Sequence, residues 1–460
     1  MSIDPLAPAT QLAAAIRAKT VGSRELLDCY LDRIDRLDPA LNAVVTLDVE
    51  RARADADAAD AATVAGTVDA VARPLHGLPI TIKDALATAG IRSTGGATEL
   101  TDHVPTEDAT VVTKLKRAGA IVFGKTNLPR WSGDVQSYNE IFGRTNNPHD
   151  VTKVPGGSSG GAAAAVAAGF TSFEIGTDIG GSVRIPAHFC GVFGLKPSFG
   201  VVPQRGYLDR VGGGITDADI NVFGPIARSA ADLALLMSVI VGPPPELAPA
   251  FRIELPAAGV TGLSGLRVGV WFDDPAAPVD AGYRAILQAT VDHLAAEGAV
   301  IVEAHPAVDF TEQGRLFGSM VTEAMLRAMP AEAQAGSVAH VAWLEMEDTR
   351  VGVRRRWAEY FETVDVMLCP VTPTAAFAHQ PGTFADRTTT VNGVEVPYLA
   401  NVGWTGLIGI AGLPSAVAPI GRTTDGLPVG VQIVSPYLHD LRSVAVAGLI
   451  GTYTPPAMAL

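Results

Sequence analysis

The sequence predicts one large α/β domain, spanning residues 1–460, in which helices cover both faces of a central β-sheet. Two regions of the chain alternate strand-like apolar runs with helix-like runs, which is the pattern of a doubly covered sheet. Hydrophobic residues make up 48% of the chain and charged residues 18%, which is enough apolar material for a large core. Neither a repeat nor a low-complexity boundary divides the sequence. A single domain is therefore favoured over several.

The N-terminal residues 1–70 are expected to form a helical segment packed on that domain. Residues 23–37 place their apolar side chains on one stripe, as in an amphipathic helix. Ser23 is the expected N-cap of this helix. Residues 49–66, rich in Ala, Asp and Arg, predict a second helix with a solvated polar face.

The first alternating region follows Pro74. LPITIKD predicts a strand that ends at Lys83, and AIVFGKTN predicts a strand that ends at Gly124, with the helical run DATVVTKLKRAGA between them. Beyond Gly265, LRVGVWF and VDVMLC repeat the strand pattern around a long helical stretch, and LPSAVAPIG and LPVGVQIVSP predict paired strands.

Charge and cysteine content exclude several classes of partner. The chain holds 34 basic and 48 acidic residues, a formal charge of −14, which repels nucleic acid and anionic membranes. Its three cysteines lie far apart without CxxC spacing, so neither a zinc site nor a disulfide framework is expected. No secretory signal and no long apolar span is found, so we expect a cytoplasmic protein. A small-molecule substrate and a monomer or homodimer are the expected partner and assembly.

Two Gly-Ser clusters, at residues 154–161 and 176–186, are the most distinctive feature of the sequence. A flexible linker does not fit, because the first cluster runs directly into a strong helix former and then a short strand. A phosphate-binding loop needs Lys and then Ser or Thr after its last glycine, but Ala162 follows Gly161. A hydrolase nucleophile elbow needs an apolar strand before the serine, and the preceding run NNPHDVTKVP is polar.

The remaining hypothesis combines both clusters with a lysine. Acyl transfer needs a nucleophile, a base and donors for the developing oxyanion. Ser182 follows Gly180-Gly181, where the backbone is free to turn several N–H groups toward one point. Lys83 lies at the end of an apolar strand, where burial favours its neutral amine. Such an amine takes a proton from Ser158, which in turn takes one from Ser182, a lysine-serine variant of the catalytic triad.

The motifs that carry these residues resemble those of the amidase signature family of hydrolases. They are GLPITIKD, PGGSSGG and GTDIGGSVRIPAHFCGVFGLKPS. The resemblance is strongest over residues 77–200, the expected catalytic core, and extends over most of the chain. It implies a large mixed β-sheet with helices on both faces, and no metal or cofactor.

The resemblance also implies a role for individual residues. Ser182 matches the acylated nucleophile and Lys83 the base. Ser158 matches the bridging serine, which in the family follows a cis peptide bond, here Gly157–Ser158. The oxyanion hole matches the backbone N–H groups of Ser182 and of three residues before it, Ile179, Gly180 and Gly181. The residues that support the turn are Ser159, Asp178 and Arg184.

For the substrate, the sequence indicates only a chemical class. Residues 128–143 and 399–412 offer apolar and aromatic surface, and the candidate pocket residues in them are Trp131, Tyr138 and Trp404. They favour an apolar substrate, such as an aryl amide or anilide, and the resemblance to the family implies a carbamate (urethane) or an ester as further options. The glycine-rich stretch 202–219 is a candidate lid over the site.

Two alternative functions remain open. One is the glutamine-hydrolysing component of a tRNA-dependent amidotransferase, its A subunit, from which the run SFGVVPQRGYLDRVGG after GLKP departs. The other, of a different class, is a binding protein that has lost catalysis, against which the intact Lys83, Ser158 and Ser182 argue.

Overall fold

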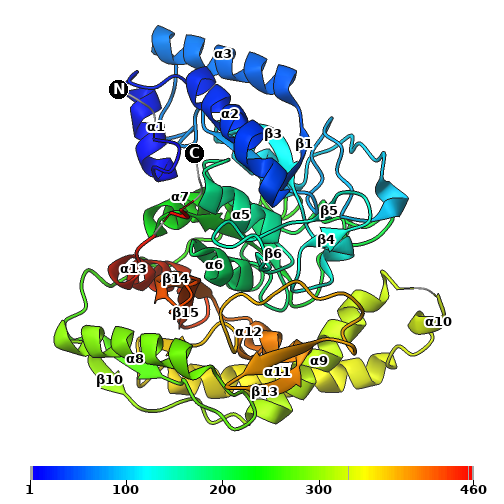
Figure 1. Cartoon of the computed structure of the whole chain (residues 1–460), viewed down its shortest axis with the longest axis vertical. Coiled ribbons are helices and arrows are strands. Elements are labelled where there is room, and N and C mark those ends of the chain that lie inside the picture. The colour runs from blue at the N-terminus through cyan, green and yellow to red at the C-terminus, as the bar shows by residue number, and fades with distance from the viewer. Residues whose placement is uncertain (1–3, 330, 454, 458–460) are drawn as a thin grey trace.

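The computed structural model describes residues 4–329, 331–453 and 455–457 of the 460-residue chain (Figure 1). The first three helices lie together at one end of the long axis, and the helices of residues 281–360 lie at the other end (Figure 1). In the described part of the chain the α-helices are α1 (Ala9–Arg17), α2 (Ser23–Leu41), α3 (Val49–Ala65), α4 (Thr110–Arg117), α5 (Gly160–Ala168), α6 (Arg184–Cys190), α7 (Ala230–Ile240), α8 (Ala281–Ala296), α9 (Phe310–Leu326), α10 (Ala331–Gln334), α11 (His340–Tyr360), α12 (Gly403–Ala411) and α13 (Asp440–Ile450).

Strands and short 3-10 helices complete the described elements. The strands are β1 (Val44–Leu47), β2 (Pro79–Lys83), β3 (Ile121–Thr126), β4 (Tyr138–Asn139), β5 (Gly143–Arg144), β6 (Glu174–Asp178), β7 (Phe193–Lys196), β8 (Val222–Ala227), β9 (Arg267–Val270), β10 (Val300–Val302), β11 (Val366–Cys369), β12 (Thr388–Val391), β13 (Val394–Pro397), β14 (Ser415–Arg422) and β15 (Pro428–Val434). The 3-10 helices are η1 (Thr98–Leu100), η2 (Arg130–Ser132) and η3 (Tyr398–Val402).

The main sheet has eight strands in the order β10-β9-β11-β15-β14-β7-β8-β6. It is mixed, because β9 pairs in parallel with β10 and β11 whereas β15 and β14 pair antiparallel. All seven residues of β15 are buried, which requires cover on both faces of the sheet. The two helix pairs α5 with α6 and α7 with α13 pack on its strands. The predicted fold class, a large mixed sheet covered by helices on both faces, is confirmed.

A second sheet of three strands has the order β1-β3-β2. Its strands β2 and β3 run parallel, as expected for a strand-helix-strand unit with α4 between them. Strand β1 belongs to the N-terminal segment 1–70, which therefore supplies a strand to the sheet as well as the helices α1, α2 and α3.

Two local expectations were wrong. Gly22, not Ser23, is the N-cap of α2, and the first N–H groups of that helix donate to the carboxylate of Asp60, 2.6 Å from Ser23 N and 3.0 Å from Arg24 N. The carboxylate of Asp60, on α3, therefore caps α2 in place of a capping side chain from the local sequence. Strand β3 continues past Gly124 to Thr126, because Lys125 and Thr126 still pair with β2.

The fold brings together the two segments that carry the candidate site. Strand β2 ends at Lys83 and lies beside β6, which ends at Asp178. The first Gly-Ser cluster leads into α5 and the second connects β6 to α6. None of the helices in the described ranges is long and apolar enough to span a membrane. No group of three or more Cys, His, Asp or Glu residues placed to hold a metal ion occurs in those ranges.

Candidate active site

The amine of Lys83 lies at the centre of a fully buried hydroxyl cluster. Its Nζ is 2.7 Å from Ser158 Oγ, 2.8 Å from Thr177 Oγ1 and 3.0 Å from Ser159 Oγ. Burial lowers the pKa of Lys83 well below 10.5, against the opposing effect of Asp178 and Glu174. In its neutral form the amine would have two N–H donors and one lone pair, so one of the three hydroxyls would then donate to the nitrogen. Lys83 is thus arranged to accept a proton.

The first Gly-Ser cluster holds Ser158 in an unusual backbone turn. The Gly157–Ser158 peptide bond is cis, as predicted. The hydroxyl of Ser137 donates to the carbonyl oxygens of Gly156 and Ser158, at 3.0 and 3.3 Å, and accepts a bond from Gly160 N. A Cβ atom on Gly157 would lie 2.5 Å from the backbone oxygen of Asp134. Only glycine fits here, because the turn packs directly on the backbone of residues 134–136.

The second Gly-Ser cluster lies against the first. The amide of Ser159 donates to the carbonyl oxygen of Ser182 at 3.1 Å, which joins the two turns. Ser182 keeps 8% of its surface exposed, whereas Ser158 and Ser159 are fully buried. Of the three serines, Ser182 is therefore the one that an external molecule can reach.

Asp178 organises the turn that leads to Ser182. Although burial acts to raise its pKa, the adjacent Arg184 guanidinium holds the pKa of Asp178 at about 2. The carboxylate accepts from Arg184 Nη2 at 2.8 Å and from the amides of Gly181 and Val183 at 2.8 and 3.1 Å. Arg184 is itself fully buried and donates to Thr405 O and Gln432 Oε1, so the turn is tied to α12 and β15.

Of the four amides expected to form an oxyanion hole, one already has an acceptor within the protein. The amide of Gly181 already donates to Asp178 Oδ1 at 2.8 Å. No hydrogen bond within the described residues uses the amides of Ile179, Gly180 or Ser182. These three N–H groups are the ones free to receive an oxyanion.

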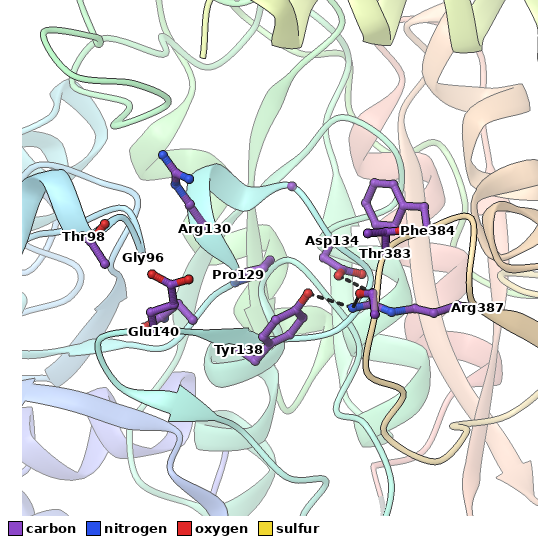
Figure 2. A pocket seen from close by; sticks show the side chains of 13 residues that line it. Gly96, Thr98, Pro129, Arg130, Asp134, Tyr138, Glu140, Thr383, Phe384 and Arg387 are labelled. Atoms are coloured by element: carbon purple, nitrogen blue, oxygen red, sulfur yellow. Dashed lines mark hydrogen bonds and ion pairs between the residues drawn. The ribbon is translucent and has the colours of Figure 1, made fainter. Parts of the chain in front are cut away.

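The three aromatic residues proposed for the pocket have different surroundings in the structure. Tyr138 is 40% exposed and lines a cavity of about 380 Å³ together with Phe384 (Figure 2). Its hydroxyl accepts from Arg387, whose guanidinium also pairs with Asp134 at 2.6 Å (Figure 2). Trp131 lies beside Gly95, where an added Cβ would be 3.1 Å from its ring.

Trp404 lies in the core, away from Tyr138's cavity. Its side chain is fully buried and packs edge to face against Trp271 and Phe310, with ring centroids 5.6 and 5.1 Å apart. The aromatic character that made Trp404 a pocket candidate is accounted for by this cluster.

Several residues of the site were missed from the sequence. Thr177 and Glu174 stand in the run EIGTD, but a threonine and a glutamate in a strand carry no signal of their own. Thr405 Oγ1 donates to Gly180 O at 2.7 Å, and the ring of Phe317 faces Gly180. Both lie more than 130 positions beyond Gly180, and Thr405 falls in the stretch 399–412, which the sequence singled out only for its apolar and aromatic surface.

A buried amine against hydroxyls, joined to a serine that follows a glycine turn, is the arrangement of a serine hydrolase that uses lysine as its base. The sequence model of the Amidase family matches residues 25–325 and 309–443. The chain therefore belongs to the amidase family.

Known proteins agree with this assignment. The chain is 34% identical over 477 residues to the A subunit of the glutamyl-tRNA(Gln) amidotransferase from Synechococcus sp. (strain CC9902), covering 93% of this chain and 92% of that protein. It is 27% identical to a solved bacterial aryl acylamidase of the amidase signature family, with a TM-score of 0.81 over 96% of this chain and 95% of the other. It is 29% identical, with a TM-score of 0.83 over 97% of this chain and 100% of the other, to a structure described as a vestigial protein complex that reveals the evolutionary origins of an s-triazine catabolic enzyme.

Proposed function

We propose that this chain hydrolyses the C–N bond of an amide through an acyl-enzyme on Ser182. The observation that carries the proposal is the buried 2.7 Å contact between Lys83 Nζ and Ser158 Oγ, on a turn that is bonded to the backbone of Ser182. A buried lysine whose pKa lies well below its usual value is typical of the base of an enzyme rather than of a binding protein.

The geometry supports a two-step mechanism. Ser158 passes the proton of Ser182 to Lys83 while Ser182 Oγ forms a bond to the substrate carbonyl carbon. The oxyanion accepts from the free amides of Ile179, Gly180 and Ser182. The C–N bond then breaks and the leaving nitrogen takes the proton back through Ser158. Water hydrolyses the acyl ester by the same proton path in reverse, which frees Ser182.

Glutamine is the first candidate substrate. The curated relatives at 33–34% identity, among them those of Synechococcus and Chromohalobacter salexigens, are A subunits of glutamyl-tRNA(Gln) amidotransferases. This relationship supports the alternative left open by the sequence better than it supports the apolar substrate. In that role the chain would work as one component of a complex rather than as a monomer or homodimer.

An apolar aryl amide is the second candidate. It is supported by the structural similarity to an aryl acylamidase. The cavity beside Tyr138 and Phe384, which none of Lys83, Ser158 and Ser182 lines, is the candidate place for its ring. The two arginines lining that cavity are each paired, Arg387 with Asp134 and Arg130 with Glu99. Because their charges are already neutralised, the cavity offers more to a neutral ring than to a carboxylate.

A substrate panel tests the proposal. Purified chain is assayed with glutamine, an aliphatic amide, an anilide, an aryl carbamate and a p-nitrophenyl ester, beside the Ser182→Ala variant. Turnover of glutamine alone supports the amidotransferase role, and turnover of the anilide supports the aryl amidase role. Labelling of Ser182 by a fluorophosphonate distinguishes an enzyme from a binding protein, because only an activated serine reacts. Absence of both labelling and turnover would overturn the proposal.

A further inference from the structure

The strand that carries Lys83 lies at a seam between the two sheets. Strand β2 belongs to the three-stranded sheet and β6 to the eight-stranded sheet, yet the two strands lie side by side. The seam is closed by residues 171–174 at the start of β6. Thr171 Oγ1 accepts from Thr81 N at 2.9 Å, and Ser172 N donates to Pro79 O at 3.3 Å.

Within this seam, the side chain of Glu174 accepts a hydrogen bond from the backbone of Lys83. Its Oε2 accepts from the backbone N–H of Lys83 at 3.0 Å and from that of Ile175 at 3.0 Å. Its Oε1 accepts from Thr126 Oγ1 on β3 at 2.8 Å. The side chain is fully buried, so the carboxyl group links β2, β3 and β6 at the position where the lysine begins.

We propose that Glu174 is a positioning residue of the amidase reaction, which holds the backbone of Lys83 so that its amine meets Ser158. The inference rests on the proposed function, in which Lys83 is the base. Without this carboxyl group, the N–H of Lys83 would be buried with no acceptor, and relieving that cost would move the end of β2. The amine would then lose its alignment with Ser158, and a misplacement of about 1 Å is enough to slow a reaction by about 100-fold.

The charges around the pair give a second readout. Burial raises the pKa of Glu174 to about 7, while Lys125 on β3 acts to lower it. The charged groups that face Lys83 are Glu174 and Asp178, and both raise its pKa against burial. Removing the charge of Glu174 while keeping an oxygen in place therefore lowers the pKa of Lys83, and moves the rise of activity to lower pH.

Two variants of Glu174 distinguish the loss of its hydrogen-bond acceptor from the loss of its charge. Glu174→Ala removes the acceptor, and we expect kcat to fall by about 10-fold or more with little change in KM, because alignment rather than binding is lost. Glu174→Gln keeps an acceptor for Lys83 N–H, so we expect a higher kcat than in Glu174→Ala and an alkaline limb that begins at lower pH. The matched control is Asp440→Asn, another fully buried carboxyl group, which bonds Ser198 rather than the site. It should keep the wild-type pH profile.

The pH profile of fluorophosphonate labelling is measured for each variant, with a thermal melt to show that it folds. A folded Glu174→Ala variant with wild-type kcat overturns the proposal. If Glu174→Ala does not fold, Glu174→Asp decides, because its shorter side chain withdraws the acceptor from Lys83 N–H: a lower kcat with unchanged KM supports the proposal, and a wild-type kcat overturns it. Failure of the proposed function has a different signature, because the wild-type chain itself would then show neither labelling nor turnover.

Discussion

Ser182 and Ser158 are residues of the same type that differ in solvent exposure. Both follow glycines, but Ser158 is sealed against Lys83 whereas Ser182 retains 8% exposure. A nucleophile must be accessible to its substrate. A residue that relays protons must instead be shielded from water, because water would exchange those protons with the solvent. The two serines therefore occupy the positions that their proposed roles require.

Replacing Ser182 by alanine should abolish covalent labelling and hydrolysis while leaving the fold intact, because its hydroxyl is the atom that carries the acyl group. Labelling with a fluorophosphonate, followed by mass spectrometry of the peptide, gives the measurement. Ser238→Ala, at an exposed serine of α7, is the matched control and should label as the wild type does. Residual turnover in Ser182→Ala, or acylation of Ser158, would contradict the assignment.

Lys83 should impose an alkaline limb on activity. Burial lowers its pKa well below 10.5, so the reactive neutral amine accumulates as pH rises through that lowered value. Labelling rate measured against pH should rise with pH and then level off. Lys83→Arg should remove the activity across this range, because a guanidinium stays protonated. A flat profile in the wild type would rule out Lys83 as the base.

The Asp178–Arg184 pair should be the costliest ion pair to break in this region. Both side chains are fully buried, so Asp178→Ala leaves an uncompensated guanidinium and should lower the free energy of unfolding by about 3–5 kcal/mol. The folded-state pKa of Asp178 is depressed to about 2, so its contribution is present above the unfolded value of about 4 and is lost as pH falls toward 2.

Chemical denaturation of Asp178→Ala at several pH values gives the measurement. The variant should lose less stability than the wild type between about pH 4 and pH 2. Asp57→Ala breaks an exposed pair with Arg24 and should change stability little. Equal effects of the two substitutions would contradict the account.

At the scale of elements, the loop between β6 and α6 depends on two glycines with different constraints. Gly181 has a φ of +111°, and an added Cβ would lie 2.6 Å from Thr405 Oγ1 and 2.8 Å from Ile185 Cδ1. At Gly180 the nearest atom to an added Cβ, on Phe317, is 3.5 Å away. An added side chain would therefore clash at Gly181 but fit at Gly180. The two adjacent positions can be compared directly by substitution.

We expect Gly181→Ala to lower kcat by about 100-fold or more, since it displaces the turn that holds Ser182 and its free amides. Gly180→Ala should retain most of the wild-type rate. Steady-state kinetics on whichever substrate the panel identifies will compare them. A tolerant Gly181 would show that the loop adjusts and that its geometry is not what limits catalysis.

Most elements could be predicted because their signals are local. The apolar runs at β2, β3, β14 and β15 and the stripe on α2 follow from short periodicity. The cap of α2 could not be predicted, because Asp60 stands 36 to 37 positions from the N–H groups that it accepts. Ser23, the local candidate, is buried with its hydroxyl unpaired among the described residues.

At the scale of the whole molecule, the site joins distant parts of the chain. Lys83, Ser158 and Ser182 lie in sequence motifs and could be predicted from them. Thr405 and Phe317 reach the same loop from α12 and α9, which belong to the C-terminal half of the chain. Such contacts depend on tertiary packing, so the residues of the proposed site that lie in motifs could be predicted, and those that pack on its loop from other elements could not.

The stretch 202–219 stays a candidate lid, and its structure gives two observations that bear on this hypothesis. Its base is fixed beside Lys83, because Leu208 N donates to Ala85 O at 2.8 Å and Ala87 N donates to Gly206 O at 2.9 Å. Its tip exposes 62% of Val211 and 71% of Ile215. Closure over an apolar substrate would bury this tip, which favours a moving tip on a fixed base.

Gly212 gives the cleanest test of the lid. It has a φ of +69°, and nothing lies within 4 Å of an added Cβ, so Gly212→Ala changes backbone preference without a clash. Strain of about 1 kcal/mol at positive φ shifts an opening equilibrium by about 5-fold, so kcat and KM should change together. Gly426→Ala, at a φ of +82° and equally open, is the matched control and should alter stability alone. Unchanged kinetics in Gly212→Ala would show that the stretch is an ordinary surface loop.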